Sequence, residues 1–189
     1  NTPRQIHIQN ALGYPDLEYA HLPLVLGTDK KRLSKRHAAT SLEEYKDLGY
    51  LDSAILNTLA RLGWSKGEKE VFYLKDLIKD FEITEVQKAG AIFDLTKLDF
   101  LNSQHMANLS HEDFINAINP FLSEIDIDIN SHPKKDLLIE SMRTSSNTLK
   151  GIALNLICYF KNIEEYDQKA IDKFIGNSDK VLIDLKNRI

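Results

Sequence analysis

The chain has 189 residues, of which 42% are hydrophobic and 28% are charged, and its formal net charge is -4 with a pI near 5.9. This composition is typical of a soluble globular protein and excludes a disordered chain or a polycation, so any nucleic-acid contact must come from a local basic patch. No run approaches the roughly 20 apolar residues of a membrane span. The single cysteine, Cys158, excludes an internal disulfide framework, and its apolar neighbours predict a buried thiol in a helix.

The N-terminal part predicts one helix and one strand. A capping box that begins at Thr2 opens a helix, which ends near Gly13. The apolar run 21–26 predicts a short buried strand, and the Gly-Thr-Asp sequence at 27–29 ends it with turn-forming residues.

A basic segment, residues 30–37, follows this turn, and five of its eight residues are lysine or arginine. Ser41 and Glu44 then form a capping box that opens the next helix. The cations therefore lie on a loop between a strand and a helix, at the edge where α/β sheets usually hold ligands, and they favour a polyanion. Taken in isolation, such a basic run is more often a solvated surface turn.

Short helices dominate the middle of the chain, because glycine stops and capping residues recur there. Trp64, beside a glycine stop, is interpreted as a packing residue rather than a platform for a stacked nucleotide. The predicted helices run from Ser41 to Gly49, from Asp52 to Gly63, over 75–81, from a capping box at Thr84, and over 93–101, where Asn102 and Ser103 end the last one.

The texture changes after about residue 108. From Phe114 to Leu185 glycine is nearly absent and apolar residues recur at helical spacing, which predicts a second, all-helical domain. One helix begins at Ser110, and a strongly apolar one covers 149–160. Residues 124–129 alternate with period two, but we interpret them as an extended linker because they stand alone among helices. The sequence starts without Met and ends inside a helical pattern, so we expect a piece of a longer protein.

The sequence Arg-Leu-Ser-Lys-Arg at 32–36 resembles the KMSKS motif of class I aminoacyl-tRNA synthetases, in the KLSKR form of glutamyl-tRNA synthetases. It departs from the family at Arg32, where Lys is usual, and at Ala38, where Gly is usual. Further segments resemble the bacterial-type glutamyl enzyme in the same order, so that the resemblance covers nearly the whole chain: residues 21–24, 49–51, 62–65 and 93–98.

This resemblance implies a mainly α fold in three parts. Residues 1–40 would end a Rossmann-type α/β catalytic domain with its KMSKS-like loop, residues 41–108 would form a helical stem-contact region, and residues 109–189 would form the N-terminal part of an α-helical anticodon-binding domain, which is truncated. Nothing resembling the family's HIGH motif occurs in the sequence. We therefore expect the 189 residues alone to be inactive in aminoacylation.

The resemblance also implies that ATP, with Mg²⁺, activates glutamate to glutamyl-adenylate. Lys35 is the expected catalytic residue, because its ammonium is a mobile point charge that can reach the departing pyrophosphate. Arg32 and Arg36 add forked donors, Ser34 adds a hydroxyl, and Leu33 completes the ATP-binding set with its backbone. No zinc is expected, because the six histidines show no metal-ligand spacing.

The implied partners are glutamate, ATP and tRNA(Glu), for a monomer without membrane contact in the cytoplasm. Enzymes of this type that reject glutamine tRNA are expected to read the third anticodon base with an arginine just beyond a Met-Arg pair. That position here is Ser145, which lacks a bidentate fork, so we hypothesise that tRNA(Gln) is charged as well. Arg143 is a possible substitute, and a structural role for it is equally open.

A second hypothesis comes from another functional class: a non-catalytic helical module that binds RNA through the basic segment. Only the synthetase reading explains the order of the motifs. Among synthetases, the glutaminyl relative is expected to continue into β-barrels, so the helical tail favours the bacterial glutamyl type.

Overall fold

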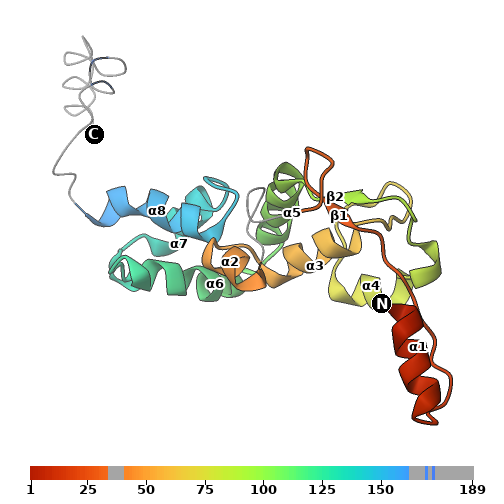
Figure 1. Cartoon of the computed structure of the whole chain (residues 1–189). Coiled ribbons are helices and arrows are strands. Elements are labelled where there is room, and N and C mark those ends of the chain that lie inside the picture. Colours follow the sequence, from red (N-terminus) through yellow and green to blue (C-terminus); the bar gives the residue numbers. More distant parts are fainter. Residues whose placement is uncertain (34–40, 162–168, 170–171, 173–189) are drawn as a thin grey trace, which may run out of the picture.

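The computed structural model describes residues 1–33, 41–161, 169 and 172 (Figure 1). These residues form a mainly helical fold with a small parallel sheet, as the resemblance implied. The helices are α1 (Thr2–Ala11), α2 (Leu42–Asp47), α3 (Asp52–Ala60), α4 (Leu74–Asp80), α5 (Leu95–Ala107), α6 (His111–Glu124), α7 (Lys135–Met142) and α8 (Leu149–Phe160), with 3₁₀ turns at Ile83–Glu85 and Ile129–Ser131.

The sheet consists of β1 (Val25–Leu26) and β2 (Ala91–Ile92). The strands are parallel, with Val25 opposite Ala91 and Leu26 opposite Ile92. The expected strand over 21–26 is therefore shortened to its last two residues. Leu22 and Leu24 are 67% and 62% exposed, so the prediction that the whole run is buried was wrong. The apolar run finds a strand partner only where β2 lies beside it.

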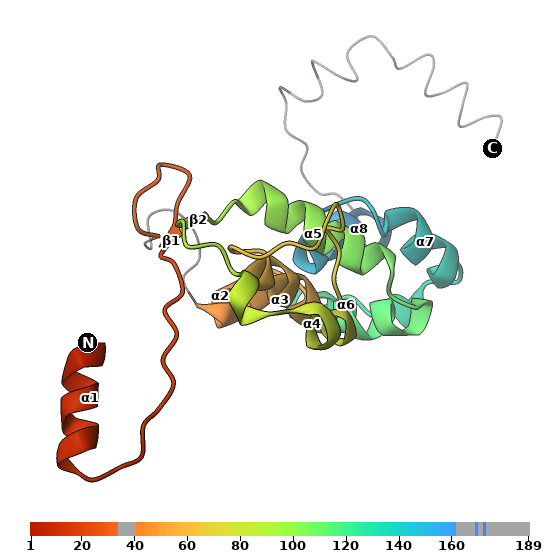
Figure 2. The same ribbon diagram turned by 90° about the vertical axis from the view of Figure 1, so that its right-hand side faces the viewer.

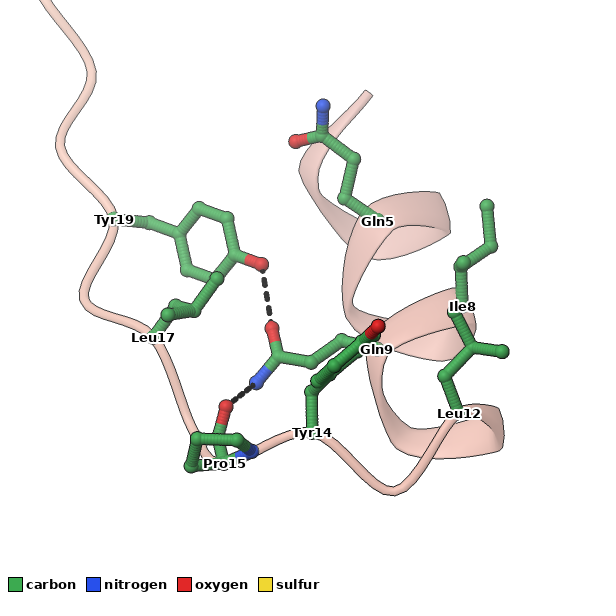
Figure 3. A pocket seen from close by; sticks show the side chains of 8 residues that line it. All are labelled: Gln5, Ile8, Gln9, Leu12, Tyr14, Pro15, Leu17 and Tyr19. Carbon is green, nitrogen blue, oxygen red and sulfur yellow. Dashed lines mark hydrogen bonds between the residues drawn. The ribbon is translucent and has the colours of Figure 1, made fainter.

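Helix α1 lies apart from the other helices and is joined to β1 by an extended segment, as Figure 2 shows. The side-chain amide of Gln9 fastens this segment to the helix: it donates to the Pro15 carbonyl at 2.5 Å and accepts from the Tyr19 hydroxyl at 2.8 Å. The two elements enclose a pocket of about 560 Å³, lined largely by apolar side chains such as Ile8 and Leu17 (Figure 3).

Helices α2 to α5 and the segments between them enclose two small apolar clusters, and most of the aromatic side chains in these clusters come from the connecting segments. One is centred on Tyr45, Phe93 and Leu98, and it connects α2 and α5 to β1. The other contains Trp64, Phe72 and Leu77. Trp64 is only 2% exposed and its Nε1 donates to a carboxylate oxygen of Glu85 at 3.2 Å, which confirms that it is a packing residue.

The largest cluster lies among α6, α7 and α8, together with Met106 at the end of α5. Helix α8 has the predicted bounds and buries Leu149, Ile152 and Leu156, which recur at the spacing of one helix face. Cys158 is two residues past Leu156, which places it away from this face. Its thiol is exposed, so the prediction of a buried thiol was wrong.

Helix α5 continues to Ala107 and does not stop at Asn102 and Ser103, as the sequence had suggested. Asn102 is fully buried, and its side chain accepts from the Leu51 amide at 2.9 Å and donates to the Asn147 carbonyl at 2.7 Å. Ser103 donates its hydroxyl to the Asp99 carbonyl one turn earlier, at 3.0 Å. Both residues usually end helices, but here Ser103 is satisfied by a carbonyl of its own helix and Asn102 by partners that are distant in the sequence.

Candidate functional site at the start of the basic segment

The described part of the basic segment begins with a tight hairpin rather than a direct passage from strand to helix. After β1 the chain turns over Gly27 to Lys31, whose amide and carbonyl bond at 2.8 Å, and returns so that Leu26 and Arg32 form an antiparallel bridge. The Leu33 amide then donates to the Val25 carbonyl at 3.0 Å. β1 therefore lies between β2 and the returning chain, and the hairpin holds the first cations at the edge of the sheet.

The turn itself places Lys30 in a left-handed conformation with φ 61°. The Lys30 amide donates to the Gly27 carbonyl at 2.9 Å, and Asp29 Oδ1 accepts from the Lys31 amide at 2.9 Å. The side chains of Lys30 and Lys31 are exposed. The turn is thus fixed by its own backbone and by Asp29, and its lysine side chains face solvent.

Two of the predicted site residues, Arg32 and Leu33, have different surroundings in the structure. Arg32 is exposed at the bridge with Leu26, so its guanidinium is available to a phosphate. Leu33 is partly buried and packs against the cluster of Tyr45, Phe93 and Leu98. Leu33 thereby anchors the segment to the fold, and its amide is already bonded to Val25. The other predicted site residues, Ser34, Lys35 and Arg36, lie outside the described residues.

The described part of the chain continues at Ser41, which is the N-cap residue of helix α2. Its predicted capping box is present: the Ser41 hydroxyl accepts from the Glu44 amide at 3.2 Å, and the Glu44 carboxylate accepts from the Ser41 amide at 3.3 Å. One turn later Tyr45 is buried against Phe93, at 5.8 Å between ring centroids. Burial, and secondly the charge of Glu44, raise the pKa of the Tyr45 hydroxyl above its usual value. Helix α2 is therefore capped at its N-terminus and anchored to the core through Tyr45.

Two residues that the sequence analysis connected with tRNA choice follow the end of α7. The Arg143 guanidinium donates to the carbonyls of Leu109 at 2.6 Å and Ser110 at 3.2 Å, and it lies 4.6 Å from the centre of the Phe114 ring. Only 13% of this side chain is exposed. These contacts favour the structural role for Arg143. Ser145 is exposed, and its hydroxyl and carbonyl accept from the Asn155 amide.

Two buried polar side chains between α3 and α5 had escaped the sequence analysis. Asn57 Oδ1 accepts from the Phe72 amide at 2.8 Å and lies 3.1 Å from His105 Nε2. Because a carbonyl oxygen only accepts, Nε2 is the donor, and in the neutral imidazole Nδ1 then carries no proton. Nδ1 is buried without a hydrogen-bond partner among the described residues, and burial lowers the pKa of His105. The sequence did not indicate this pairing, because a single Asn and a single His on two separate helices form no recognisable pattern.

Within the described part of the chain, no group of three or more His, Cys, Asp or Glu residues comes together in a way that could hold a metal ion. In the same residues, no helix is both long and apolar enough to cross a membrane.

Known proteins resemble this chain over most of its length. The glutamate–tRNA ligase of Thermodesulfovibrio yellowstonii is 44% identical over 180 residues, which cover 93% of this chain and 39% of that protein. Glutamate–tRNA ligase 1 of Campylobacter hominis is 40% identical over 97% of this chain and 39% of its own length. The crystal structure of a glutamate tRNA ligase from Elizabethkingia meningosepticum, in complex with its amino acid, superposes with a TM-score of 0.75 at 29% identity, over 95% of this chain and 39% of that one.

The chain therefore spans about two fifths of the length of these relatives. Residues 1–100, more than half of the chain, match the family described as tRNA synthetases class I (E and Q), catalytic domain. This match includes the hairpin with Arg32, the small sheet and helices α1 to α4. The chain belongs to the class I tRNA synthetases of the glutamyl and glutaminyl kind.

Proposed function

We propose that the protein carrying this sequence is a glutamate–tRNA ligase, which activates glutamate with ATP to glutamyl-adenylate and transfers the glutamyl group to tRNA(Glu). The observation that carries the proposal is the hairpin with exposed Arg32 at the start of the basic segment, inside the part that matches the synthetase family. The relatives at about 40% identity support glutamate as the amino acid, because each is named a glutamate–tRNA ligase.

In the first step a glutamate carboxylate oxygen would attack the α-phosphorus of ATP, and the bond to the leaving pyrophosphate would break. Negative charge then grows on the α-phosphate and on the pyrophosphate, and cations held near both lower the barrier. Arg32 would offer a planar fork to phosphate oxygens, and Lys35 a compact charge. Mg²⁺ would bind with ATP, because phosphate oxygens are the ligands it prefers.

Lys35→Ala tests the chemical role of the basic segment. We would place this chain in the Thermodesulfovibrio yellowstonii enzyme, in exchange for the matching region, and measure glutamate-dependent exchange of pyrophosphate into ATP by this chimera. We expect Lys35→Ala to slow adenylate formation by roughly 10² to 10³, the cost of losing one preorganised donor to the transition state. Glutamate affinity should change little, because Lys35 would act on the phosphates. Lys31→Ala in the exposed turn is the matched control, and comparable losses in rate and in glutamate affinity would contradict the assigned role.

The second substrate that we propose is tRNA(Gln), which is supported by two residues near the end of α7. Ser145 cannot present a bidentate fork to a base, and the Arg143 fork is already bound to the Leu109 and Ser110 carbonyls. We therefore expect the chimera to charge tRNA(Glu) and tRNA(Gln) with glutamate when both are supplied at equal concentration. Ser145→Arg should restore a preference for tRNA(Glu). Strong rejection of tRNA(Gln) by the unchanged chimera would mean that another residue reads the base.

We place this function in the cytoplasm, where tRNA charging serves translation, and propose that one chain acts as a monomer. A non-catalytic RNA-binding module remains the alternative class of function. The synthetase family match over residues 1–100 and the names of the relatives do not favour it.

A further inference from the structure

The turn between α2 and α3 lies so close to the start of α8 that their backbones are in direct contact. Gly49, with φ +87°, forms this turn, and its carbonyl accepts from the Leu149 amide at 3.0 Å. A Cβ atom on Gly49 would lie 2.5 Å from the Lys150 nitrogen and 2.9 Å from the Leu149 nitrogen. Backbone atoms cannot yield as a flexible side chain can, so any larger residue at Gly49 would push α8 away from α2.

A buried amide joins the same two regions from the side of α5. Asn102 accepts from the Leu51 amide, two residues after Gly49, and donates to the Asn147 carbonyl, two residues before Leu149. Asn102 is fully buried, so separation of the two regions would remove hydrogen-bond partners from a buried side-chain amide. An acceptor and a donor are both needed here, and a side-chain amide supplies both.

Apolar contacts close the same region. Leu51 packs against the cluster of α6 to α8, to which Leu149 belongs, and Met106 of α5 is a member of that cluster. Outside this core, the Lys150 ammonium donates to the Asp47 carbonyl at 3.3 Å. The contact between the turn after α2 and the start of α8 therefore combines apolar packing with backbone and side-chain hydrogen bonds, and has a polar edge.

We propose that this joint, formed by Gly49, Asn102, Asn147 and Leu149, makes α2 and α8 move as one body. Gly49 and Asn102 are then positioning residues, because α2 follows the basic segment directly and α8 carries Asn155, which holds Ser145. Through the joint, the placement of Ser145, which we propose to take part in tRNA choice, is linked to the start of the basic segment, where Leu33 packs against the cluster that contains Tyr45 of α2. This functional consequence rests on the proposed function, whereas the mechanical coupling does not.

Unfolding of the 189-residue chain tests the coupling with two probes. The first probe is the fluorescence of Trp64, the only tryptophan in the sequence, which reports on the helices before α6. The second probe is far-ultraviolet circular dichroism, which reports on all helices. In urea, both probes should give the same midpoint for the unchanged chain. Gly49→Ala should split the curves, with part of the helical signal lost at lower urea than the Trp64 signal. Coincident curves for Gly49→Ala, or separate curves for the unchanged chain, would overturn the proposal.

Gly67→Ala is the matched control, because Gly67 has the same sign of φ, +58°, with nothing within 4 Å of an added Cβ. It should shift both curves together. Should Gly49→Ala fail to fold, native-state hydrogen exchange of the unchanged chain decides the question. The Leu149 and Leu51 amides should then exchange as slowly as the amides in the centre of α3. If their exchange were about 100-fold faster, which corresponds to about 2.7 kcal/mol less protection, the joint would open by itself and the proposal would be wrong.

The functional consequence is measured in the chimera with two forms of tRNA(Glu), one with its own anticodon and one with a replaced anticodon. Gly49→Ala should reduce the advantage in kcat/KM of the native anticodon by roughly tenfold, and leave charging of the other form unchanged. An equal loss on both forms would overturn the link to the basic segment. If the unmodified chimera charges no tRNA, the proposed function fails, and the unfolding experiment still decides the joint.

Discussion

Lys30 adopts the left-handed conformation at the turn before Arg32, with φ 61°, although it has a Cβ atom. That conformation costs a residue with a side chain roughly 1–2 kcal/mol, which glycine avoids at the expense of a more flexible unfolded chain. We predict that Lys30→Gly raises the free energy of unfolding by about 0.5–1 kcal/mol, measured by urea titration. Lys30→Asn should give a smaller gain, and Lys30→Ala none. A loss of stability in Lys30→Gly would contradict the turn described for Lys30.

Single residues were predictable where their role depends on nearby sequence. Ser41 forms its capping box with Glu44, three positions away, and Trp64 was placed in the core because it stands beside the Gly63 stop, although its packing partners Phe72 and Phe81 come later in the chain. Cys158 and Arg143 were not settled by such neighbours. Cys158 is exposed because the tertiary fold buries another face of α8, and Arg143 reaches carbonyls of residues 109 and 110, which are distant in the sequence.

At the scale of elements, α3 and α5 pack against each other around Asn57 and His105. Burial lowers the pKa of His105, so the folded protein holds its imidazole neutral while the unfolded chain takes up a proton near its ordinary pKa of about 6.5. The stability from this neutral imidazole is therefore complete above about pH 6.5 and is lost as the pH falls through and below that value.

We predict that the urea concentration at the unfolding midpoint decreases when the pH is lowered from 8 to 5.5. The decrease should be smaller for the His105→Gln variant over the same range. His111 acts in the opposite direction, because hydrogen bonds to Glu140 and Asp136 raise its pKa and favour the folded state at low pH. The urea midpoint of the His111→Gln variant should therefore decrease more than that of the unchanged chain over the same pH range. His7→Gln, in the exposed part of α1, is the control. If His105→Gln and the unchanged chain showed the same pH dependence, His105 would not be a cause of the loss of stability at low pH.

The elements themselves show which local signals were sufficient. Helix α8 has its predicted bounds because a long apolar face and a Thr148 cap act together. Helix α5 was predicted too short, since Asn102 and Ser103 look like a helix end until the Leu51 amide and the Asn147 carbonyl are placed beside them. Thr84 does not open a helix, and only a 3₁₀ turn at Ile83–Glu85 forms there. The Gln87 amide instead bonds to the Gly63 carbonyl at 2.7 Å, which draws the chain away from a helical path.

For the whole molecule, the mainly helical fold and the synthetase family followed from ordered motifs, whereas the arrangement of the parts did not. No local pattern indicates that Gly49 meets Leu149, or that α1 lies apart from the other helices (Figure 2). The division at residues 40 and 108 stays a prediction, and so do the roles of Ser34, Lys35 and Arg36. Contacts between distant segments depend on shape and on buried polar partners, which one sequence does not display.

The most direct measurement of the central claim is aminoacylation by the chimera in which this chain replaces the matching part of the Thermodesulfovibrio yellowstonii enzyme. With tRNA(Glu), ATP and either glutamate or glutamine, the account predicts that glutamate is attached at a rate within about tenfold of the parent enzyme, which corresponds to a barrier change of at most about 1.4 kcal/mol, and that glutamine is not attached. A folded chimera that binds tRNA but attaches no glutamate would contradict the account and would favour the non-catalytic RNA-binding module.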